Sequence, residues 1–385
     1  MNIMLVSSSN YKENGAAWSL INLARYALDA GHHVVVLLTK RGSLEVELQA
    51  QGIPCRIVKH LDKWCVPVDS AYPSGVVQHI KRIVRICYDR IFADAQIRRI
   101  IDENRIDIVH INAIATGVAA RAAIRKKKKL VWHLREFMGE DLRFVDPESA
   151  FRLVSRADCA VAISDAIQRE YAGSVHARMV KIFNGVDAQR FYASRQILGS
   201  ETVKIVISGR IMPTKGQLTL LKAVHIVKGA GLGPFECHIL GPTRDKQYLG
   251  QLMEYASANG LERCVYFDGP SDSVPERLRE MDILCLCSTR EAFGLSTVEG
   301  MLSGCLVIGT GAGGTVEILE DGVTGLLYEP GGGENALAER LIWAMRNPVK
   351  AREIALRGQE HALNHHSAEG AERRTLQLYE ELLGR

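Results

Sequence analysis

The stretch Arg290–Glu317 reads REAFGLSTVEGMLSGCLVIGTGAGGTVE and decides the fold that the sequence predicts. The short apolar run Ile283–Cys287 comes directly before it, and such a run is typical of a buried strand in a parallel sheet. A loop that contains Gly294 follows, and then Ser296-x-x-Glu299 has the form of a capping box that opens a helix. The order strand, glycine loop and helix start presents backbone N–H groups and a positive dipole end, which favour phosphate.

Two acids, Glu291 and Glu299, flank this expected phosphate site. They suit the hydroxyl groups of a sugar, although Glu299 also fits as the capping partner and Glu291 as a solvated loop acid. A second apolar run, Cys305–Ile308, leads into the closely spaced glycines of Gly309–Gly314 and another helix start. Two adjacent units of this kind form a crevice at the carboxyl ends of parallel strands, where open α/β sheets bind ligands.

These segments resemble one known family. EAFGLSTVE, from Glu291 to Glu299, is similar to the E-x7-E motif of family-4 retaining glycosyltransferases, and GGTVEI, at residues 313–318, is similar to the G-G-x-x-E-[IL] segment that follows it. Residues 322–327 resemble the family's next segment, G-x-x-G-x-L. The resemblance is densest over residues 209–330. It implies an α/β fold of the GT-B architecture, with two Rossmann-like doubly wound domains facing a central crevice.

A pair of cations follows the predicted strand Val203–Ser208. The segment GRIMPTKG, which contains Arg210 and Lys215, resembles the family's G-R-x-x-x-x-K-G signature. Arginine offers a planar fork to phosphate oxygens and lysine a point charge, so both residues are expected to bind the donor diphosphate and to stabilise the leaving group. The alternative is a pair of surface cations in a loop.

The resemblance assigns further donor contacts in this half of the chain. Backbone N–H groups of the loop and helix start are expected to hold phosphate, Glu299 to accept ribose hydroxyls, and Glu291 to contact the transferred sugar. The residues expected to hold phosphate are Gly294, Leu295, Ser296 and Thr297.

The first half of the chain also opens as a strand–helix–strand unit. We expect strands at residues 2–7 and 33–38, with a helix between them that begins at Asn14-Gly15 and ends at Gly31. Members of the family often carry Gly-Gly at this helix start, where the backbone approaches the donor phosphate. Here the match is partial, and Gly15 is the expected donor-binding residue.

The run Leu130–Glu136, LVWHLRE, reads as a strand that ends in polar residues. His133 lies at the carboxyl end of this strand, where it either satisfies a structural hydrogen bond or faces the crevice. His133, Arg135 and Glu136 fit the family's H-x-[HR]-[DE] setting, and the resemblance therefore implies that His133 lies near the reacting centre.

Length and composition indicate a soluble two-domain protein. The 385 residues are 47% hydrophobic and 24% charged, ordinary values for a globular chain. We expect an acceptor-side domain at residues 1–195, a nucleotide-sugar domain at 196–365, and a helix at 366–385 that crosses back to the first domain. The nine cysteines lack C-x-x-C spacing, which indicates reduced thiols in a cytoplasmic protein. No signal-peptide pattern and no apolar run of about 20 residues is present.

Charge is unevenly distributed between the two halves. Residues 1–195 contain 29 Lys and Arg against 20 Asp and Glu, a net charge of +9, which leaves −5 for the rest of the chain. Bases concentrate in the predicted helix 76–101 and in Lys126–Lys129, and an irregular loop at 59–75 contains Trp64. This pattern indicates peripheral docking on an anionic membrane face, or alternatively a core-packed helix with a solvated basic face. No aromatic interleaving or motif indicates nucleic-acid binding.

Together these features predict a retaining, metal-independent glycosyltransferase. The donor is a nucleotide sugar, with a UDP-sugar as the first choice, and the acceptor is a glycan or a lipid-linked hydroxyl in polysaccharide or glycolipid synthesis. No cofactor or obligatory metal is expected, because no D-x-D sequence is placed like a metal site. The alternatives are a sugar-nucleotide epimerase, a phosphorylase, or a silent partner that only binds a nucleotide sugar. A dehydrogenase is disfavoured, since no G-x-G-x-x-G opens either domain.

Overall fold

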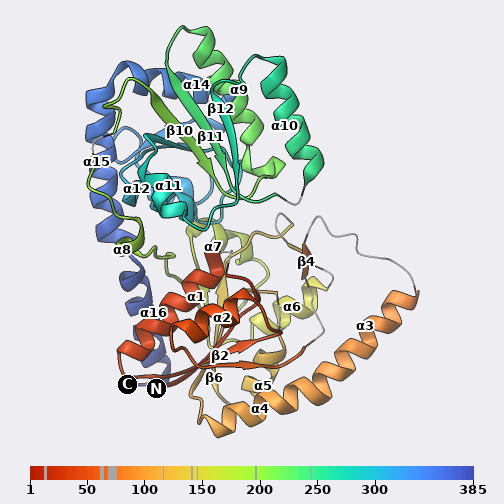
Figure 1. Ribbon diagram of the computed structural model, residues 1–385. Coiled ribbons are helices and arrows are strands. Elements are labelled where there is room, and N and C mark those ends of the chain that lie inside the picture. Colours follow the sequence, from red (N-terminus) through yellow and green to blue (C-terminus); the bar gives the residue numbers. More distant parts are fainter. Residues whose placement is uncertain are drawn as a thin grey trace. The chain divides into compact units, whose positions relative to one another are not determined.

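The computed structural model describes residues 1–12, 15–60, 65–67, 76–115, 117–139, 142–144, 146–195, 197–243 and 245–385 (Figure 1). The chain forms two compact units, which are described separately. The N-terminal unit comprises Met1–Gly185 together with Ala368–Arg385, and the C-terminal unit comprises Val186–Ser367. The C-terminal helix therefore belongs to the N-terminal unit. The boundary between the units follows Gly185, whereas the sequence had suggested residue 195.

A parallel sheet with the strand order β3-β2-β1-β5-β6-β8-β9 forms the centre of the N-terminal unit. The order reverses between β1 and β5, as in a doubly wound fold. The inner strands of the sheet are mainly buried apolar runs, as expected for a parallel sheet covered on both faces, and the edge strands β3 and β9 are half-buried or exposed. The strands are β1 (Asn2–Val6), β2 (His33–Leu38), β3 (Cys55–Ile57), β5 (Ile108–Ile111), β6 (Lys129–Leu134), β8 (Cys159–Ala162) and β9 (Met179–Lys181).

Helices α1 (Gly15–Asp29) and α16 (Ala368–Leu383) pack against each other and against one face of this sheet. Their core combines side chains from both ends of the chain, including Leu20, Ile108, Val131 and Tyr379. The remaining helices of the unit are α2 (Ser43–Ala50), α3 (Val76–Tyr88), α4 (Asp94–Glu103), α5 (Val118–Arg125), α6 (Pro147–Val154) and α7 (Asp165–Tyr171).

Two local features of the N-terminal unit refine the sequence expectations. The segment 59–75 is not irregular throughout, because β4 (Cys65–Pro67) pairs antiparallel with β7 (Leu142–Phe144). The helix expected at 76–101 is interrupted by a π-helical turn at Asp89–Ala93 between α3 and α4. Trp64 and Asn14 lie outside the described residues.

The sheet of the C-terminal unit is also parallel, with the order β12-β11-β10-β13-β14-β15. Strand order reverses between β10 and β13, so the prediction of two Rossmann-like domains is confirmed. The strands are β10 (Val203–Ser208), β11 (Phe235–Leu240), β12 (Val265–Gly269), β13 (Ile283–Leu286), β14 (Leu306–Thr310) and β15 (Leu326–Tyr328).

Helices cover both faces of this second sheet. They are α8 (Ala188–Phe191), α9 (Gln217–Gly229), α10 (Lys246–Ala258), α11 (Val274–Arg279), α12 (Leu295–Leu302), α13 (Thr315–Ile318), α14 (Gly333–Arg346) and α15 (Pro348–His365), with short 3-10 turns at Pro213–Lys215 and Pro330–Gly332. Beyond β15 the described chain is mainly helical to its last residues.

Candidate functional site: a donor edge and a buried histidine network

The expected donor residues of the C-terminal unit gather where its strand order reverses. Strands β10 and β13 are neighbours there, and their carboxyl ends open onto the same edge of the sheet. Gly216, with φ 73°, ends the loop after β10, and a Cβ atom on it would lie 2.3 Å from the carbonyl oxygen of Cys287. Only glycine fits this approach, which brings Lys215 beside the loop that follows β13. We call this region the donor edge, defined by residues 209–217 and 288–299.

Lys215 and Glu291 form an ion pair at the donor edge. Lys215 Nζ donates to Glu291 Oε2 at 2.8 Å, and the two side chains are 29% and 17% exposed. The sequence had assigned these residues to different parts of a ligand, whereas here they contact each other. The carboxylate fixes the position of the ammonium group while leaving part of it accessible to an anion.

Arg210 is exposed on the same loop, and Gln217 shapes the backbone behind it. Gln217 is 1% exposed, its Nε2 donates to Arg210 O at 2.9 Å, and its Oε1 accepts from the backbone N–H of Met212 at 3.4 Å. This residue was not predicted. Its sequence signal is a polar residue at the first position of a helix whose buried face is otherwise apolar.

Helix α12 begins at the donor edge, but the predicted capping box is wrong. Gly294 is the N-cap residue, with φ 97° and no side-chain cap, and Ser296 lies inside the helix. Ser296 Oγ donates to Ser208 O at 3.3 Å, which ties the start of α12 to the end of β10. The N–H of Thr297 donates to Gly294 O at 2.9 Å. The other N–H groups at the start of a helix have no i−4 acceptor, and such a start is suited to an anion.

The two glycine loops, which the sequence predicted to be adjacent, pack backbone against backbone. The N–H of Gly314 donates to Glu291 O at 2.7 Å. A Cβ atom on Gly313 would lie 2.5 Å from the same oxygen, and one on Gly314 would lie 2.6 Å from Phe293 Cα. The second loop thus supports the loop that carries Glu291.

Glu299 lies in the second turn of α12, beyond the helix start. Burial raises the pKa of Glu299 to about 7, and the positive charge of Arg190 opposes that shift. A carboxyl group in this state accepts hydrogen bonds from hydroxyl groups once it is ionised. Ligand hydroxyls would then replace the water that burial has removed.

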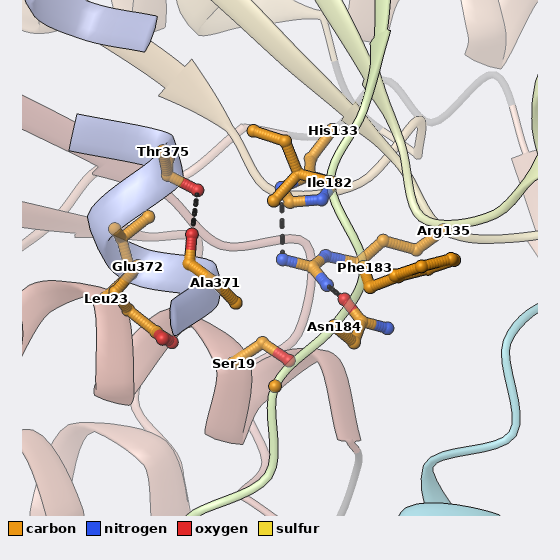
Figure 2. Close-up of a pocket in the computed structure, with 11 residues that line it drawn as sticks. Ser19, Leu23, His133, Arg135, Ile182, Phe183, Asn184, Ala371, Glu372 and Thr375 are labelled. Atoms are coloured by element: carbon orange, nitrogen blue, oxygen red, sulfur yellow. Dashed lines mark hydrogen bonds between the residues drawn. The ribbon is translucent and has the colours of Figure 1, made fainter. Parts of the chain in front are cut away.

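In the N-terminal unit, His133 lies at the end of β6 in the wall of a small pocket (Figure 2). The residue is 5% exposed, and the pocket volume of about 20 Å³ holds a single water molecule. The other walls come from α1, the segment after β9 and α16, represented by Ser19, Phe183 and Glu372. Burial lowers the pKa of His133 well below its usual value, and the charge of Arg135 lowers it further.

Arg135 is the centre of the hydrogen-bond network beside this pocket. Its Nε and Nη2 donate to Asn112 O and Oδ1, both at 3.0 Å, and its Nη1 donates to Asn184 Oδ1. Burial lowers the pKa of Arg135 to about 10, so the guanidinium is charged at neutral pH. Asn112 Nδ2 in turn donates to Ala16 O at 2.8 Å, next to the exposed Gly15 at the start of α1.

Several members of this network were not predicted from the sequence. His110 in β5 and Tyr379 in α16 hydrogen-bond to each other at 2.5 Å, and Asn112 and Asn184 bind Arg135. Within the sequence the available signal is the histidine in the apolar run of β5. The partners come from segments far apart in the chain.

Among the described residues, no group of three or more His, Cys, Asp and Glu side chains is placed to hold a metal ion. The cysteines whose side chains are described are free thiols. No helix in the described ranges has the length and apolarity that a membrane span requires.

Two protein families match the chain. "Glycosyltransferase Family 4" matches residues 13–190, and "Glycosyl transferases group 1" matches residues 191–361. The uncharacterized glycosyltransferase MJ1178 of Methanocaldococcus jannaschii is 26% identical over 74% of this chain and 78% of its own length. The phosphatidyl-myo-inositol mannosyltransferase of Mycobacterium leprae is 28% identical over 52% of this chain and 53% of its own length.

The fold is shared with a solved structure. The crystal structure of Anabaena Alr3699/HepE in complex with UDP and glucose superposes on this chain with a TM-score of 0.80. The two chains are 23% identical, and the match covers 99% of this chain and 100% of that chain. Both family matches and this fold agree with the paired Rossmann-like sheets and the donor edge. The chain is therefore a glycosyltransferase of the group 1 and family 4 type with the GT-B fold.

Proposed function

We propose that the protein transfers a sugar from a nucleoside diphosphate sugar to a hydroxyl acceptor with retention of the anomeric configuration. The observation that carries this proposal is the Lys215–Glu291 pair beside the start of α12, where strand order reverses. A cation, an anion-binding helix start and a buried acid suit a diphosphate and a sugar in one ligand. Retention is supported by the resemblance of residues 291–299 to the motif of retaining family members.

The chemistry requires stabilisation of a leaving diphosphate. The bond between the anomeric carbon and the diphosphate oxygen breaks, a bond to the acceptor oxygen forms, and the proton of the acceptor hydroxyl passes to an oxygen of the departing diphosphate. Arg210 and Lys215 would neutralise the departing diphosphate, which is electrostatic catalysis without an obligatory metal. Backbone N–H groups of residues 294–296 would hold phosphate, while the N–H of Thr297 already donates to Gly294 O. Glu299 would bind ribose hydroxyls, and Glu291 would contact the transferred sugar.

Uridine is our first choice for the nucleoside. The Anabaena protein of the same fold was crystallised with UDP, with UDP and glucose, and with UDP-glucose. Gly15 is assigned to the donor phosphate and His133 to the reacting centre, as the family resemblance implies.

A thermal-shift screen of nucleoside diphosphates and nucleotide sugars tests the donor, because a ligand that binds only the native state raises the unfolding temperature by mass action. We expect uridine nucleotides to give the largest shift. Product analysis follows with the selected donor. Release of nucleoside diphosphate with a new glycosidic bond supports transfer, whereas an isomerised nucleotide sugar supports an epimerase. Tight donor binding without turnover over a broad acceptor panel supports a silent binding partner. NMR of the product linkage shows whether the configuration is retained.

For the acceptor we propose a lipid-linked hydroxyl at an anionic membrane face on the cytoplasmic side. Helix α3 and the following π turn expose large apolar side chains: Ile83 is 48% exposed, Val84 62%, Ile91 61% and Phe92 55%. An exposed apolar face beside bases is typical of a helix that lies in a membrane interface. These exposures support an interfacial role for α3 and the π turn, whereas Ile97 of α4 is buried in the core.

Only some of the basic side chains in this region are available to contact an anionic membrane surface. Arg98 and Arg125 pair with Asp94, Lys126 pairs with Asp102, and other ion pairs join Arg99 to Glu103 and Lys129 to Asp158. Within the described residues, no ion pair includes Lys81, Arg85, Arg90, Lys127 or Lys128. The docking surface is therefore defined by Lys81, Arg85 and Arg90 with the four apolar side chains above, and the segment Lys126–Lys129 contributes less than the sequence suggested.

Co-sedimentation with vesicles of anionic or zwitterionic lipid tests this surface. We expect binding to the anionic vesicles only, weakened by salt because exposed charges are screened. The double variant Lys81→Glu/Arg85→Glu should abolish binding, and Lys126→Glu, which removes a base already paired with Asp102, should retain most of it. Protein that stays in the supernatant at low salt would rule out the membrane proposal and leave a soluble acceptor.

A further inference from the structure

Four buried side chains in the N-terminal unit form a line from α16 to the carboxyl end of β6. Tyr379 Oη lies 2.5 Å from His110 Nδ1, His110 Nε2 lies 3.3 Å from His133 Nδ1, and Arg135 Nη2 lies 3.2 Å from the same His133 nitrogen. Their exposed fractions are 0%, 0%, 5% and 8% for Tyr379, His110, His133 and Arg135. The function proposed above assigns no role to Tyr379 or His110.

Sheet register explains why the two histidines meet. His110 in β5 is the neighbour of Val131 in β6, and His133 lies two residues further along β6, so both imidazoles project from the same face of the sheet. This is the face that α1 and α16 cover. Tyr379 reaches His110 from α16, which is formed by the last residues of the chain.

The donors in this line have a fixed direction. A guanidinium group only donates, so His133 Nδ1 accepts from Arg135 and carries no proton. His110 Nε2 faces the same nitrogen, and a favourable contact requires that His110 carries its proton there. His110 Nδ1 is then an acceptor, which matches the hydroxyl group of Tyr379 as the donor.

The protonation states agree with this direction. Burial lowers the pKa of His110 to about 3 and lowers that of His133 well below its usual value, and the charge of Arg135 contributes to both shifts. Burial raises the pKa of Tyr379 well above its usual value. At neutral pH the phenol therefore keeps its proton, and each imidazole is neutral with a single proton.

The single ring proton of His133 is on Nε2, because Nδ1 is an acceptor. Nε2 is buried and has no hydrogen-bond partner among the described residues. His133 forms part of the pocket wall, together with Arg135 and Asn184, as Figure 2 shows. A buried N–H group without a partner is unfavourable, so this atom is suited to an oxygen of a bound ligand.

We propose that Tyr379 and His110 are positioning residues that hold His133 as the neutral tautomer protonated on Nε2, so that His133 donates a hydrogen bond to a substrate oxygen and does not act as a general base. This inference rests on the proposed function for the identity of the substrate, a sugar nucleotide or its hydroxyl acceptor. The tautomer itself depends only on the protein. The C-terminal helix thus contributes directly to the state of the histidine that the sequence identified.

Long-range ¹H–¹⁵N NMR of the full chain labelled with ¹⁵N-histidine tests the tautomer without any substrate. His133→Gln and His110→Gln assign the two rings. We expect His133 to be protonated on Nε2 and unprotonated on Nδ1, with no titration between about pH 6 and about pH 8, the range in which an exposed histidine changes charge. A proton on His133 Nδ1, or titration within that range, overturns the proposal whether or not the protein transfers sugars.

Tyr379→Phe tests the positioning role of Tyr379, because it removes the hydroxyl group that contacts His110 and keeps the buried ring. We expect the His110 resonances to move toward tautomer averaging and kcat to fall about tenfold with the donor that the thermal-shift screen selects. Tyr171→Phe is the matched control: Tyr171 is also buried in this unit, donates to Glu136 O at 2.9 Å and has its ring beside Phe151. An unchanged kcat and unchanged His110 resonances in Tyr379→Phe overturn the positioning role.

A second pair of variants keeps the test decisive if Tyr379→Phe unfolds. His110→Gln retains an N–H donor that reaches His133 Nδ1, and His110→Met has similar length and no donor. We expect kcat of the Gln variant to exceed that of the Met variant at least fivefold, with equal thermal unfolding. Equal kcat values in the two variants would show that His110 only fills space. If no transfer activity exists, the NMR result alone decides the tautomer and only the proposed function fails.

Discussion

The donor edge of the C-terminal unit and the histidine network of the N-terminal unit both lie at the carboxyl ends of parallel strands, but they are built differently. At the donor edge, Lys215 and Glu291 are partly exposed and each follows its own strand within a few residues. In the network, His133 and Arg135 are buried and depend on side chains from β5, the segment after β9, and α16. The first region is encoded locally, and the second is assembled from distant segments.

This difference has a consequence for what each residue controls. A partly exposed ion pair contributes little to stability, so its side chains are available for a ligand. A buried charge that satisfies several hydrogen bonds is strongly coupled to folding, because removal of one member leaves the others without partners. Substitutions at the donor edge should therefore change activity, and substitutions in the network should change stability as well.

The largest effect is expected for Lys215→Ala. Loss of the ammonium group removes charge stabilisation of the departing diphosphate and should lower kcat about 100- to 1,000-fold, as for other lost donors to a developing anion. Arg210→Ala should act similarly. The unfolding free energy should change by less than about 1 kcal/mol. Lys222→Ala, which breaks the comparable exposed pair with Glu334, is the control. Wild-type turnover in both Lys215→Ala and Arg210→Ala would contradict the donor assignment.

Arg135→Met tests whether a substitution in the histidine network lowers the stability of the protein. The variant leaves Asn112 and Asn184 without their buried donor and should lose about 3–5 kcal/mol of unfolding free energy. Urea unfolding measures the change, and Arg152→Met, on the exposed face of α6, should stay within about 0.5 kcal/mol of the wild type. A stability loss below about 1 kcal/mol would show that the network is not coupled to folding as we describe.

Glu299→Gln should have a smaller effect. It should weaken the binding of UDP and raise the unfolding free energy at alkaline pH. We expect affinity for UDP to fall roughly tenfold, since a neutral amide is a weaker acceptor for ribose hydroxyls. The folded pKa of about 7 lies above 4.5, the usual pKa of an exposed glutamate. The native state therefore binds more protons between these values, and the wild type loses stability as pH rises through about 7.

The uncharged Gln variant avoids that loss and should be roughly 1–3 kcal/mol more stable than the wild type near pH 8, at about 1.4 kcal/mol per pKa unit. Calorimetry measures the affinity, and denaturant unfolding at acid and alkaline pH measures the stability. Glu339→Gln, an exposed acid on α14, is the control. An equal affinity for UDP in Glu299→Gln and wild type would remove Glu299 from the donor site.

The smallest effect is expected for a metal chelator. If the cations at the donor edge stabilise the diphosphate by themselves, EDTA should leave kcat unchanged within about twofold, in contrast to the loss expected for Lys215→Ala. Loss of activity in EDTA that added Mg²⁺ or Mn²⁺ restores would show that the protein needs a cation in addition to Arg210 and Lys215.

The sequence predicted much of the donor edge because its signals are local. The strands at 33–38 and 203–208 match the structure, and the predicted adjacency of the two glycine loops matches the contact of Gly313–Gly314 with Glu291 and Phe293. The capping box failed because a left-handed glycine, Gly294, begins α12 and places Ser296 inside the helix. Sequence spacing alone does not distinguish these two helix starts.

The histidine network was only partly predictable, because its members come from distant segments of the chain. His133 and Arg135 were identified by their place at a strand end, but Tyr379 lies 269 residues from His110 in the chain. No local pattern reports such a pair, since it depends on the register of β5 with β6 and on the packing of α16 against α1.

By itself the sequence determined the class of the protein: apolar runs followed by glycine loops specify parallel strands with a phosphate-binding edge, because strand burial and glycine backbone freedom are local properties. The tertiary structure alone decided which groups meet. It paired Lys215 with Glu291 and raised the pKa of Glu299 to about 7. It also fixed the donor direction around His133. Those properties depend on burial and on distances of about 3 Å between groups from separate elements, which only the folded chain provides.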